Sequence, residues 1–284
     1  MKDILEKRAT IIRGIRKFFD DQGFVEVETA VRIDAPAPEE HIDCPPVVGG
    51  GYLRASPELQ MKKLLAAGMD KIYQIGPCFR EGEKGSRHNP EFTMLEWYRK
   101  GATYLDIKDD LEGLFSLFEK SFALQGGRRE CSRVLRVRDA YLKYAGWDPW
   151  TDWNQDRFDF DMATKIEPAI KNIGGGIFLM DYPIQAASLA KVREDVAERW
   201  EFYWNGMEIA NCFTELCDCD EQLNRFEKAK ESRKLLKEAD YPIDCEFIGC
   251  LPQIEKAAGV ALGVDRLVMI LTQAKEISSI RAFL

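Results

Sequence analysis

Hydrophobic side chains recur along this chain at intervals that predict both helices and strands. Apolar residues within 4–19 fall at helical spacings, and Gly23 is placed to end that helix. Residues 24–29 then alternate in the manner of a strand. Further helices are predicted over 56–67 and 104–123, the latter with an apolar stripe along one side. The chain therefore mixes the two kinds of element along its length.

A hairpin with a long basic loop is predicted in the first third of the chain. One strand ends at Arg80, a loop punctuated by glycines follows, and residues 91–99 are extended. Alternation places Phe92, Glu96 and Tyr98 on one face, with Phe92 and Glu96 about 13 Å apart, so they suit opposite ends of one ligand. Arg80 adds a cation suited to phosphate. For Glu96 alone, a half-buried strand with a satisfied carboxylate is the simpler explanation.

A second, acidic hairpin is predicted around Asn205-Gly206, a strong signal for a two-residue turn. Counting from this turn places Tyr203 opposite Glu208 and Glu201 opposite Ala210. Glu201 and Glu208 then lie on one face as diagonal neighbours. Like charges repel there unless a cation lies between them, and Mg²⁺ bridging ATP phosphates suits two carboxylates. A solvated acidic hairpin is the alternative.

The same hairpin carries two more polar residues whose position requires an irregular strand. Asn211 and Glu215 have the opposite strand parity to Glu208, so a regular strand would send them to the other face. We predict a β-bulge between Glu208 and Asn211, because one extra residue brings all of these side chains to the same face.

Two helix starts also carry candidate chemistry. Ser56 is predicted as an N-cap, with Pro57 in the first turn and Glu58 beside the positive helix end, and capping alone explains these residues. Residues 259–271 are predicted as a short strand feeding a helix with Arg266 in its first turn. An arginine there can reach phosphate or lie on an adenine ring.

The pattern of apolar residues also gives predictions for the second half of the chain. Residues 128–171 are less regular, with helical pieces around 137–144, and are predicted as a surface-lying insertion. Residues 177–182 form an apolar run typical of a buried strand, and Pro183 bounds it.

Composition limits the classes of function. The 284 residues are 45% hydrophobic, enough for one large core, and no segment resembles a signal peptide or a membrane span, so a cytoplasmic protein is expected. The net charge of −8 argues against a polyanionic partner such as tRNA. The eight cysteines lack paired spacing, which favours reduced thiols over a zinc site.

Four stretches resemble one known family. Phe79-Arg80 followed by HNPEFTMLEWY resembles motif 2 of class II aminoacyl-tRNA synthetases, in the form found in the lysine enzymes. GVALGVDRL at 259–267 resembles motif 3 of the same class. SPEL at 56–59 and GMEIANCFTEL at 206–216 extend the match over nearly the whole chain.

The resemblance implies a fold and an architecture. It implies an α+β class II catalytic fold, an antiparallel β-sheet flanked by helices, in a single domain spanning 1–284 with the insertion at about 128–171. An N-terminal OB-fold for the anticodon is not expected, because the chain starts at the helix that resembles motif 1. In this class that helix and the strand after it build a homodimer interface.

Three positions depart from the family pattern. Ala30 replaces the proline that usually follows the motif 1 strand, and Gly82 replaces the motif 2 glutamate, whose adenine contact is expected to pass to backbone atoms or to Glu83. Ala261 replaces a glycine of motif 3. The stand-alone ligases of elongation factor P resemble this chain in carrying alanine there, whereas lysyl-tRNA synthetases carry glycine.

The resemblance also implies roles for individual residues. Arg80 and Arg266 are predicted as catalytic, and Glu201 with Glu208 as the ligands of Mg²⁺. Residues implied to bind ATP are Arg80, Glu81, Gly82, Glu83, His88, Asn89, Phe92, Glu201, Phe202, Gly263 and Arg266. Residues implied to meet the amino-acid substrate are Ser56, Pro57, Glu58, Glu96, Tyr98, Glu208, Asn211, Glu215 and Ala261.

The expected reaction is activation of lysine or β-lysine by ATP as an aminoacyl-adenylate, because a pocket with several acids suits a diamino substrate. The expected acceptor is a lysine side chain of elongation factor P. Alternatives from the same sequence are a truncated lysyl-tRNA synthetase-like enzyme, a non-catalytic regulatory paralogue, and an amide-forming relative such as an ammonia-dependent asparagine synthetase.

Overall fold

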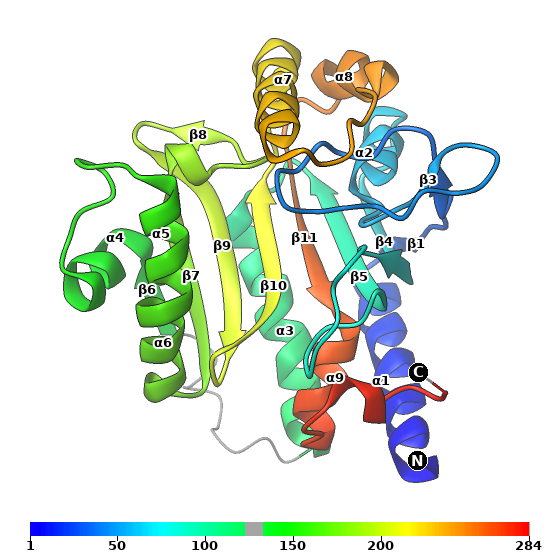
Figure 1. Cartoon of the computed structure of the whole chain (residues 1–284). Coiled ribbons are helices and arrows are strands. Elements are labelled where there is room, and N and C mark those ends of the chain that lie inside the picture. Colours follow the sequence, from blue (N-terminus) through cyan, green and yellow to red (C-terminus); the bar gives the residue numbers. More distant parts are fainter. Residues whose placement is uncertain (123–132, 284) are drawn as a thin grey trace. The chain divides into compact units, whose positions relative to one another are not determined.

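The computed structural model of the chain describes residues 1–122 and 133–283 (Figure 1). The chain divides into two compact units. The first consists of Met1–Gly101, Leu216–Ala257 and Ala261–Leu284, and the second of Ala102–Glu215 and Ala258–Val260. Strand β11, Ala257–Gly263, contributes residues to both. The end predicted for the third helix, at Ala123, and the predicted start of the insertion, at 128, lie outside the described residues.

The first unit is built on the hairpin predicted around the basic loop. Strand β4, Lys71–Phe79, pairs antiparallel with β5, Glu91–Lys100, in one unbroken register. The short β1, Val25–Glu26, pairs parallel with β4, so the strand predicted over 24–29 forms over only two residues. A separate two-stranded sheet joins β2, Arg32–Ile33, to β3, Tyr52–Leu53.

Helix α1, Lys2–Asp21, confirms the predicted N-terminal helix and supplies the core on one face of the hairpin. Ile11, Ile15 and Phe19, spaced by four residues, are its buried side chains. The Phe19 ring lies 5.1 Å from that of Trp97, centroid to centroid. Trp97 is therefore on the core face of β5, as alternation predicts.

Four more helices are found among the described residues of the first unit. Helix α9, Val264–Thr272, follows β11 as predicted and lies beside α1. Helix α2 is Glu58–Ala66. It begins two residues after the predicted start at 56 and ends one residue before the predicted end at 67. The others are α7, Cys219–Leu236, and α8, Cys245–Cys250, with short 3₁₀ turns at Leu251–Gln253 and Ile277–Ser279.

The second unit contains the acidic hairpin. Strands β9, Val196–Trp204, and β10, Met207–Thr214, pair antiparallel across the turn, where Asn205 and Gly206 both have positive φ. These φ values confirm the predicted two-residue turn, which needs left-handed backbone at both positions. On the far side of β9 lie β7, Gly176–Pro183, and then β6, Arg133–Arg136, while the short β8, Val192–Arg193, also pairs with β9.

The predicted bulge is present and changes the register beyond it. Tyr203 lies opposite Glu208 as expected, and the register shifts between Glu208 and Ala210. Glu201 therefore lies opposite Asn211, and the predicted pairing of Glu201 with Ala210 is wrong. That pairing assumed a regular ladder, whereas the extra residue moves every later partner by one position.

Helix α3, Tyr104–Phe122, lies over the second unit's strands, with Trp200 donating a 2.6 Å hydrogen bond from its ring to the Tyr104 carbonyl. The segment predicted as an insertion includes β6, then α4, Val137–Ala140, α5, Gln155–Asp161, and α6, Glu167–Ile173, with π-helical turns between them (Figure 1). It buries Tyr141 against Phe158, so one side of it packs inward.

Both units combine strands, mostly antiparallel, with helices packed on them, and the predicted α+β class is confirmed. Buried β7 bounded by Pro183 and the helical piece around 137–144 are confirmed as well. The single-domain assignment and the insertion boundaries stay predictions. Among the described residues, none of the helices has the length and apolar character that a membrane crossing needs.

Candidate active site

Arg80 stands directly after β4, where the basic loop begins. Its guanidinium carbon lies 5.2 Å from the centre of the Phe92 ring, and its Nη1 lies 3.4 Å from Glu83. The Arg80 Nε is buried and has no hydrogen-bond partner among the described residues. A buried guanidinium donor left open in this way is suited to an oxygen of a ligand.

His88 and Arg266 meet at the end of the same loop. Nη2 of Arg266, in the first turn of α9, lies 2.6 Å from Nε2 of His88. Burial lowers the pKa of His88, and the positive charge of Arg266 lowers it further. The imidazole is therefore neutral near pH 7, and its Nε2 accepts from the guanidinium. Two residues predicted to bind ATP, His88 and Arg266, are thus brought together.

The other residues predicted for ATP lie around this loop. The Asn89 side-chain nitrogen is buried and lacks a partner among the described residues. Glu81 is exposed and donates its backbone N–H to the Asp43 carbonyl at 2.7 Å. Gly82 has a φ of 75°, which a residue with a side chain rarely adopts. A methyl group built on Gly263 would meet only the Arg266 side chain at ordinary contact distance, so packing among the described residues does not require a glycine there.

The predicted amino-acid residues of the first unit form a buried hydrogen-bonded group. Ser56 donates its hydroxyl to one Glu96 oxygen at 2.6 Å, and Tyr98 donates its hydroxyl to the other at 2.7 Å. Glu96 is 0% exposed. Burial, and then the nearby charge of Glu58, raise the pKa of Glu96 to about 7. Among the described residues, the hydrogen bonds to this carboxyl group come from neutral hydroxyls, and Lys62 nearby lowers its pKa only in part. A further positive charge there would favour its ionised form.

Glu58, by contrast, has its own cation. Lys62, one helical turn later on α2, places its Nζ 2.5 Å from a Glu58 oxygen and is 1% exposed. Sequence reasoning missed Lys62, although a glutamate followed four residues later by lysine is a recognisable helical pair. The N-cap assignment needs a correction: Pro57 holds that position, while Ser56 still accepts the Glu58 backbone N–H at 2.9 Å.

In the second unit, Glu201 is paired with an arginine of its own strand. Nη2 of Arg199 lies 2.6 Å from one Glu201 oxygen, and the Tyr203 hydroxyl donates to the other at 2.7 Å. The side chains of Arg199 and Glu201 are 15% and 13% exposed. Both oxygens of this carboxylate are thus engaged by donors within the strand.

Arg199 also fixes the neighbouring strand. Its Nε donates to the Asn211 side-chain oxygen at 3.1 Å, and its Nη1 donates to the Ala186 carbonyl at 2.8 Å. Its guanidinium lies over the Tyr182 ring at 4.3 Å. Burial lowers the pKa of Arg199, but Glu201 together with the other acids and phenols around it outweighs burial, and the pKa of Arg199 is raised. Sequence reasoning missed this residue, although its parity with Glu201 on the strand predicts a shared face.

The remaining predicted residues have different surroundings. Glu208 lies opposite Tyr203 and so on the Glu201 face, and Glu215 is 3% exposed and bridges to Ala190 just beyond β10. Phe202 points to the other face and packs on Phe115 and Phe178 in the core. Only the backbone of Phe202 is therefore placed to meet a ligand from the Glu201 face. Ala261 is half-buried within β11.

The two units thus carry two kinds of polar surface. The first unit has cations around the basic loop, and on β5 it has a buried carboxyl group whose hydrogen bonds, among the described residues, come from hydroxyls. The second unit carries an acidic face on β9 and β10 with Arg199 among the acids. Cations of this kind suit a polyphosphate, and acids suit a metal ion or an ammonium group.

Comparison with known proteins identifies the family. The whole of residues 1–284 matches the family of class II tRNA synthetases for D, K and N. The chain belongs to this class II synthetase family. Proteins named elongation factor P (R)-β-lysine ligase are among its relatives: that of Photorhabdus laumondii subsp. laumondii is 38% identical, that of Proteus mirabilis 36% and that of Yersinia enterocolitica 37%. Each alignment covers 98% of this chain and 94% of the relative.

Membership of the class II synthetase family implies the use of ATP and confirms the predicted fold. In the part of the chain that the structure describes, no group of three or more His, Cys, Asp or Glu side chains is arranged to hold a metal ion by itself. A metal ion here would need oxygen ligands from a substrate as well.

Proposed function

We propose that this protein activates lysine or β-lysine with ATP as an aminoacyl-adenylate and transfers it to a lysine side chain of elongation factor P. Relatives covering nearly the whole chain are named for a reaction of this kind. The observation that carries the choice of a diamino substrate is Glu96, a fully buried carboxyl group bonded only to the Ser56 and Tyr98 hydroxyls. Lys62 lowers the pKa of Glu96 but is paired with Glu58, and an ammonium group bonded to the Glu96 oxygens would favour the ionised carboxylate further.

Adenylate formation needs positioning and charge stabilisation rather than a protein nucleophile. The substrate carboxylate attacks the α-phosphorus of ATP in line, and pyrophosphate leaves. Arg80, with its open Nε, would hold the α-phosphate, and Phe92 beside it would lie against the adenine. His88 and Arg266, already in contact, would hold the β- and γ-phosphates. The acceptor amine then attacks the adenylate carbonyl and releases AMP.

Mg²⁺ fits the acidic hairpin in donor chemistry. Glu201 and Glu208 present carboxylates on one face, and Mg²⁺ commonly takes one or two carboxylates together with phosphate oxygens. When bound, it would neutralise charge on the triphosphate. In the protein alone, Arg199 is the counter-ion of Glu201.

Glu96 with Tyr98, in the first unit, would receive an ammonium group of the substrate. Glu215 is proposed separately, as an acid of the second unit suited to an ammonium group. Asn211, held by Arg199, adds a neutral contact. The methyl group of Ala261 is proposed to narrow the space available to the substrate. We also propose a homodimer through α1, which size-exclusion chromatography with light scattering tests, and a cytoplasmic location, where the proposed acceptor occurs.

Elongation factor P is preferred over tRNA as the acceptor because the net charge of −8 opposes binding to a nucleic-acid polyanion. The test is amino-acid-dependent pyrophosphate exchange with α-lysine and β-lysine, followed by transfer to purified elongation factor P or to tRNA. We expect exchange with at least one diamino acid and transfer to the protein acceptor. Transfer to tRNA alone would replace the proposal with a tRNA-charging function, and exchange with no diamino acid would remove it.

A further inference from the structure

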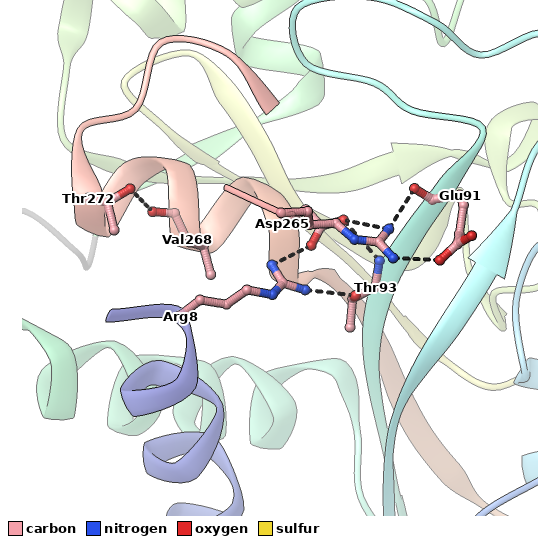
Figure 2. Close-up of polar contacts among 7 residues, drawn as sticks. Arg8, Glu91, Thr93, Asp265, Val268 and Thr272 are labelled. Carbon is pink, nitrogen blue, oxygen red and sulfur yellow. Dashed lines mark hydrogen bonds and ion pairs between the residues drawn. The ribbon is translucent and has the colours of Figure 1, made fainter. Parts of the chain in front are cut away.

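Asp265 is a buried carboxylate that joins three elements of the first unit (Figure 2). It lies in the first turn of α9 and is 2% exposed. Nη1 of Arg8, on α1, lies 2.7 Å from one of its oxygens. The backbone N–H of Thr93, on β5, donates to the other at 3.0 Å. One side chain therefore connects the N-terminal helix, the strand after the basic loop and the helix after β11.

Arg8 closes this arrangement into a ring of contacts. Its Nη2 donates to the Thr93 hydroxyl at 2.8 Å while its Nη1 pairs with Asp265 (Figure 2). The Arg8 side chain is 13% exposed, so solvent screens the ion pair little. A guanidinium presents donors in a fixed fork, and a lysine could not make both contacts with the same geometry.

The Asp265 carboxylate also gives a backbone N–H of β5 the hydrogen-bond acceptor that it needs. Opposite Thr93 on β4 lies Pro77. The Thr93 N–H donates away from β4 to the Asp265 carboxylate, which takes the place of a carbonyl on a neighbouring strand. Side-chain capture of a strand N–H fixes α9 to β5 at one defined residue.

A second arginine supports the same carboxylate from the C-terminal segment. Nη1 of Arg281 lies 4.0 Å from Asp265 and donates to the Glu91 carbonyl at 2.9 Å. Its other terminal nitrogen pairs with the Glu91 carboxylate. The start of β5 is thus held at Glu91 and at Thr93, on either side of Phe92.

The hydrogen bond between Thr93 and Asp265 joins the chain neighbours of two residues that are proposed to contact ATP. Thr93 directly follows Phe92, proposed to lie against the adenine, and Asp265 directly precedes Arg266, proposed for the terminal phosphates. A rigid link between Thr93 and Asp265 therefore sets the separation between the two ends of the nucleotide site. Small errors in such a separation reduce binding and rate strongly.

We propose that Asp265 and Arg8 are positioning residues for ATP, holding Phe92 and Arg266 at the separation that the nucleotide requires. Neither side chain needs to touch the ligand. This inference rests on the proposed function only in taking ATP as the ligand. It assigns to α1 a part in nucleotide binding.

The test compares Arg8→Gln and Arg8→Lys with Lys17→Gln, which removes an exposed ion pair with Asp21 on the same helix. The readouts are the Kd for ATP measured by calorimetry without amino acid, the KM for the diamino acid, and hydrogen exchange of the Thr93 amide. For Arg8→Gln we expect the ATP Kd to rise about tenfold, with the KM for the amino acid changed by less than about twofold. Arg8→Lys should give an intermediate Kd, and Lys17→Gln should match the unchanged protein.

Faster exchange of the Thr93 amide in Arg8→Gln would support the link, because that N–H shares the carboxylate with Arg8. Equal losses in ATP and amino-acid binding, or an unchanged ATP Kd in Arg8→Gln, would overturn the proposal. If Arg8→Gln fails to fold, Arg8→Lys decides: an ATP Kd equal to that of the unchanged protein rejects it. If the unchanged protein binds ATP but activates no diamino acid, the proposed function fails while this test still stands.

Discussion

Two carboxyl groups on strands of this protein, Glu96 fully buried and Glu201 mostly buried, have opposite kinds of hydrogen-bond partner. Glu201, on β9, has the guanidinium of Arg199 at 2.6 Å and the hydroxyl of Tyr203 on its other oxygen. Glu96, on β5, accepts only from the Ser56 and Tyr98 hydroxyls, and burial raises its pKa to about 7. One acid is neutralised within its own strand, and the other is left without a cation on its oxygens.

The difference in partners indicates which kind of ligand each carboxyl group would bind. A carboxyl group that is buried without a cation is in part protonated at neutral pH, and it gains most from a ligand that carries a positive charge. A carboxylate already paired with arginine gains less from a single cation, and a ligand there has to compete with Arg199. The first arrangement suits an ammonium group, and the second suits a site that fills only when phosphates arrive.

The largest effect is expected from removing the cation beside Glu201. Arg199→Met leaves a mostly buried carboxylate with only the Tyr203 hydroxyl, and losing one partner of a buried pair costs about 3 kcal/mol or more of unfolding free energy. Urea denaturation measures the loss. Adding Glu201→Gln should recover part of it, because the second change removes the unpaired charge.

The control for that experiment is Arg16→Met, which removes an exposed pair with Glu26. Exposed pairs contribute about 1 kcal/mol or less, so this variant should unfold close to the unchanged protein. Equal losses from Arg199→Met and Arg16→Met would show that Glu201 does not depend on its arginine.

Removing the charge of Glu96 is expected to raise the free energy of unfolding rather than lower it. Its pKa in the folded protein, about 7, lies above the ordinary value of 4.5, so folding favours the protonated form. The resulting stability is present below pH 4.5 and is lost as the pH rises through 7. Glu96→Gln mimics the protonated form and should raise the unfolding free energy at pH 8 by up to about 3 kcal/mol, with little change at pH 4. A loss of stability at pH 8 would contradict this account.

The same pKa sets the pH dependence of substrate binding. Near pH 6 about a tenth of the Glu96 carboxyl groups are ionised, and near pH 8 about nine tenths are. Because the ionised form is the one proposed to bind an ammonium group, the Kd for the diamino acid should fall about tenfold between these values. Calorimetry in several buffers measures both the Kd and the proton released. A Kd that does not change with pH would separate Glu96 from the substrate.

The smallest effect is expected at a position that carries no charge. Ala261→Gly removes one methyl group. One methylene in a hydrophobic pocket changes specificity by about 10- to 200-fold, and the half-buried position of Ala261 places its effect at or below the low end of that range. We expect the ratio of kcat/KM for α-lysine to that for β-lysine to rise severalfold in pyrophosphate exchange. An unchanged ratio would show that selection between the two isomers lies with the charged residues alone.

Local sequence patterns predicted a helix or a turn correctly where a single local feature, such as apolar spacing or a turn dipeptide, determines it. The spacing of Ile11, Ile15 and Phe19 is enough for α1, and the Asn205-Gly206 turn is enough for the acidic hairpin. The parity conflict at Asn211 predicted the bulge, because the family residues needed one face. The reduced length of β1 was not visible, since its extent depends on pairing with β4 rather than on its own side chains.

The site was predictable as a set of residue types but not as a set of partners. The resemblance to synthetase motifs supplied Arg80, Glu96 and Arg266. It did not indicate that His88 contacts Arg266 or that Arg199 engages Glu201, because these contacts depend on the paths of the loop and of the bulged strand. The Asp265 link was hidden for the same reason, since its three elements are distant in sequence.

The central claim is that Glu96 receives an ammonium group of the substrate. It is tested most directly by removing the terminal amine of the substrate and the charge of Glu96 in the same experiment. Pyrophosphate exchange is measured for lysine and for norleucine, which lacks only the terminal amine, with the unchanged protein and with Glu96→Gln. We predict a preference for lysine of about 100-fold in the unchanged protein that falls at least about tenfold in the variant. The same preference in both proteins would contradict the account.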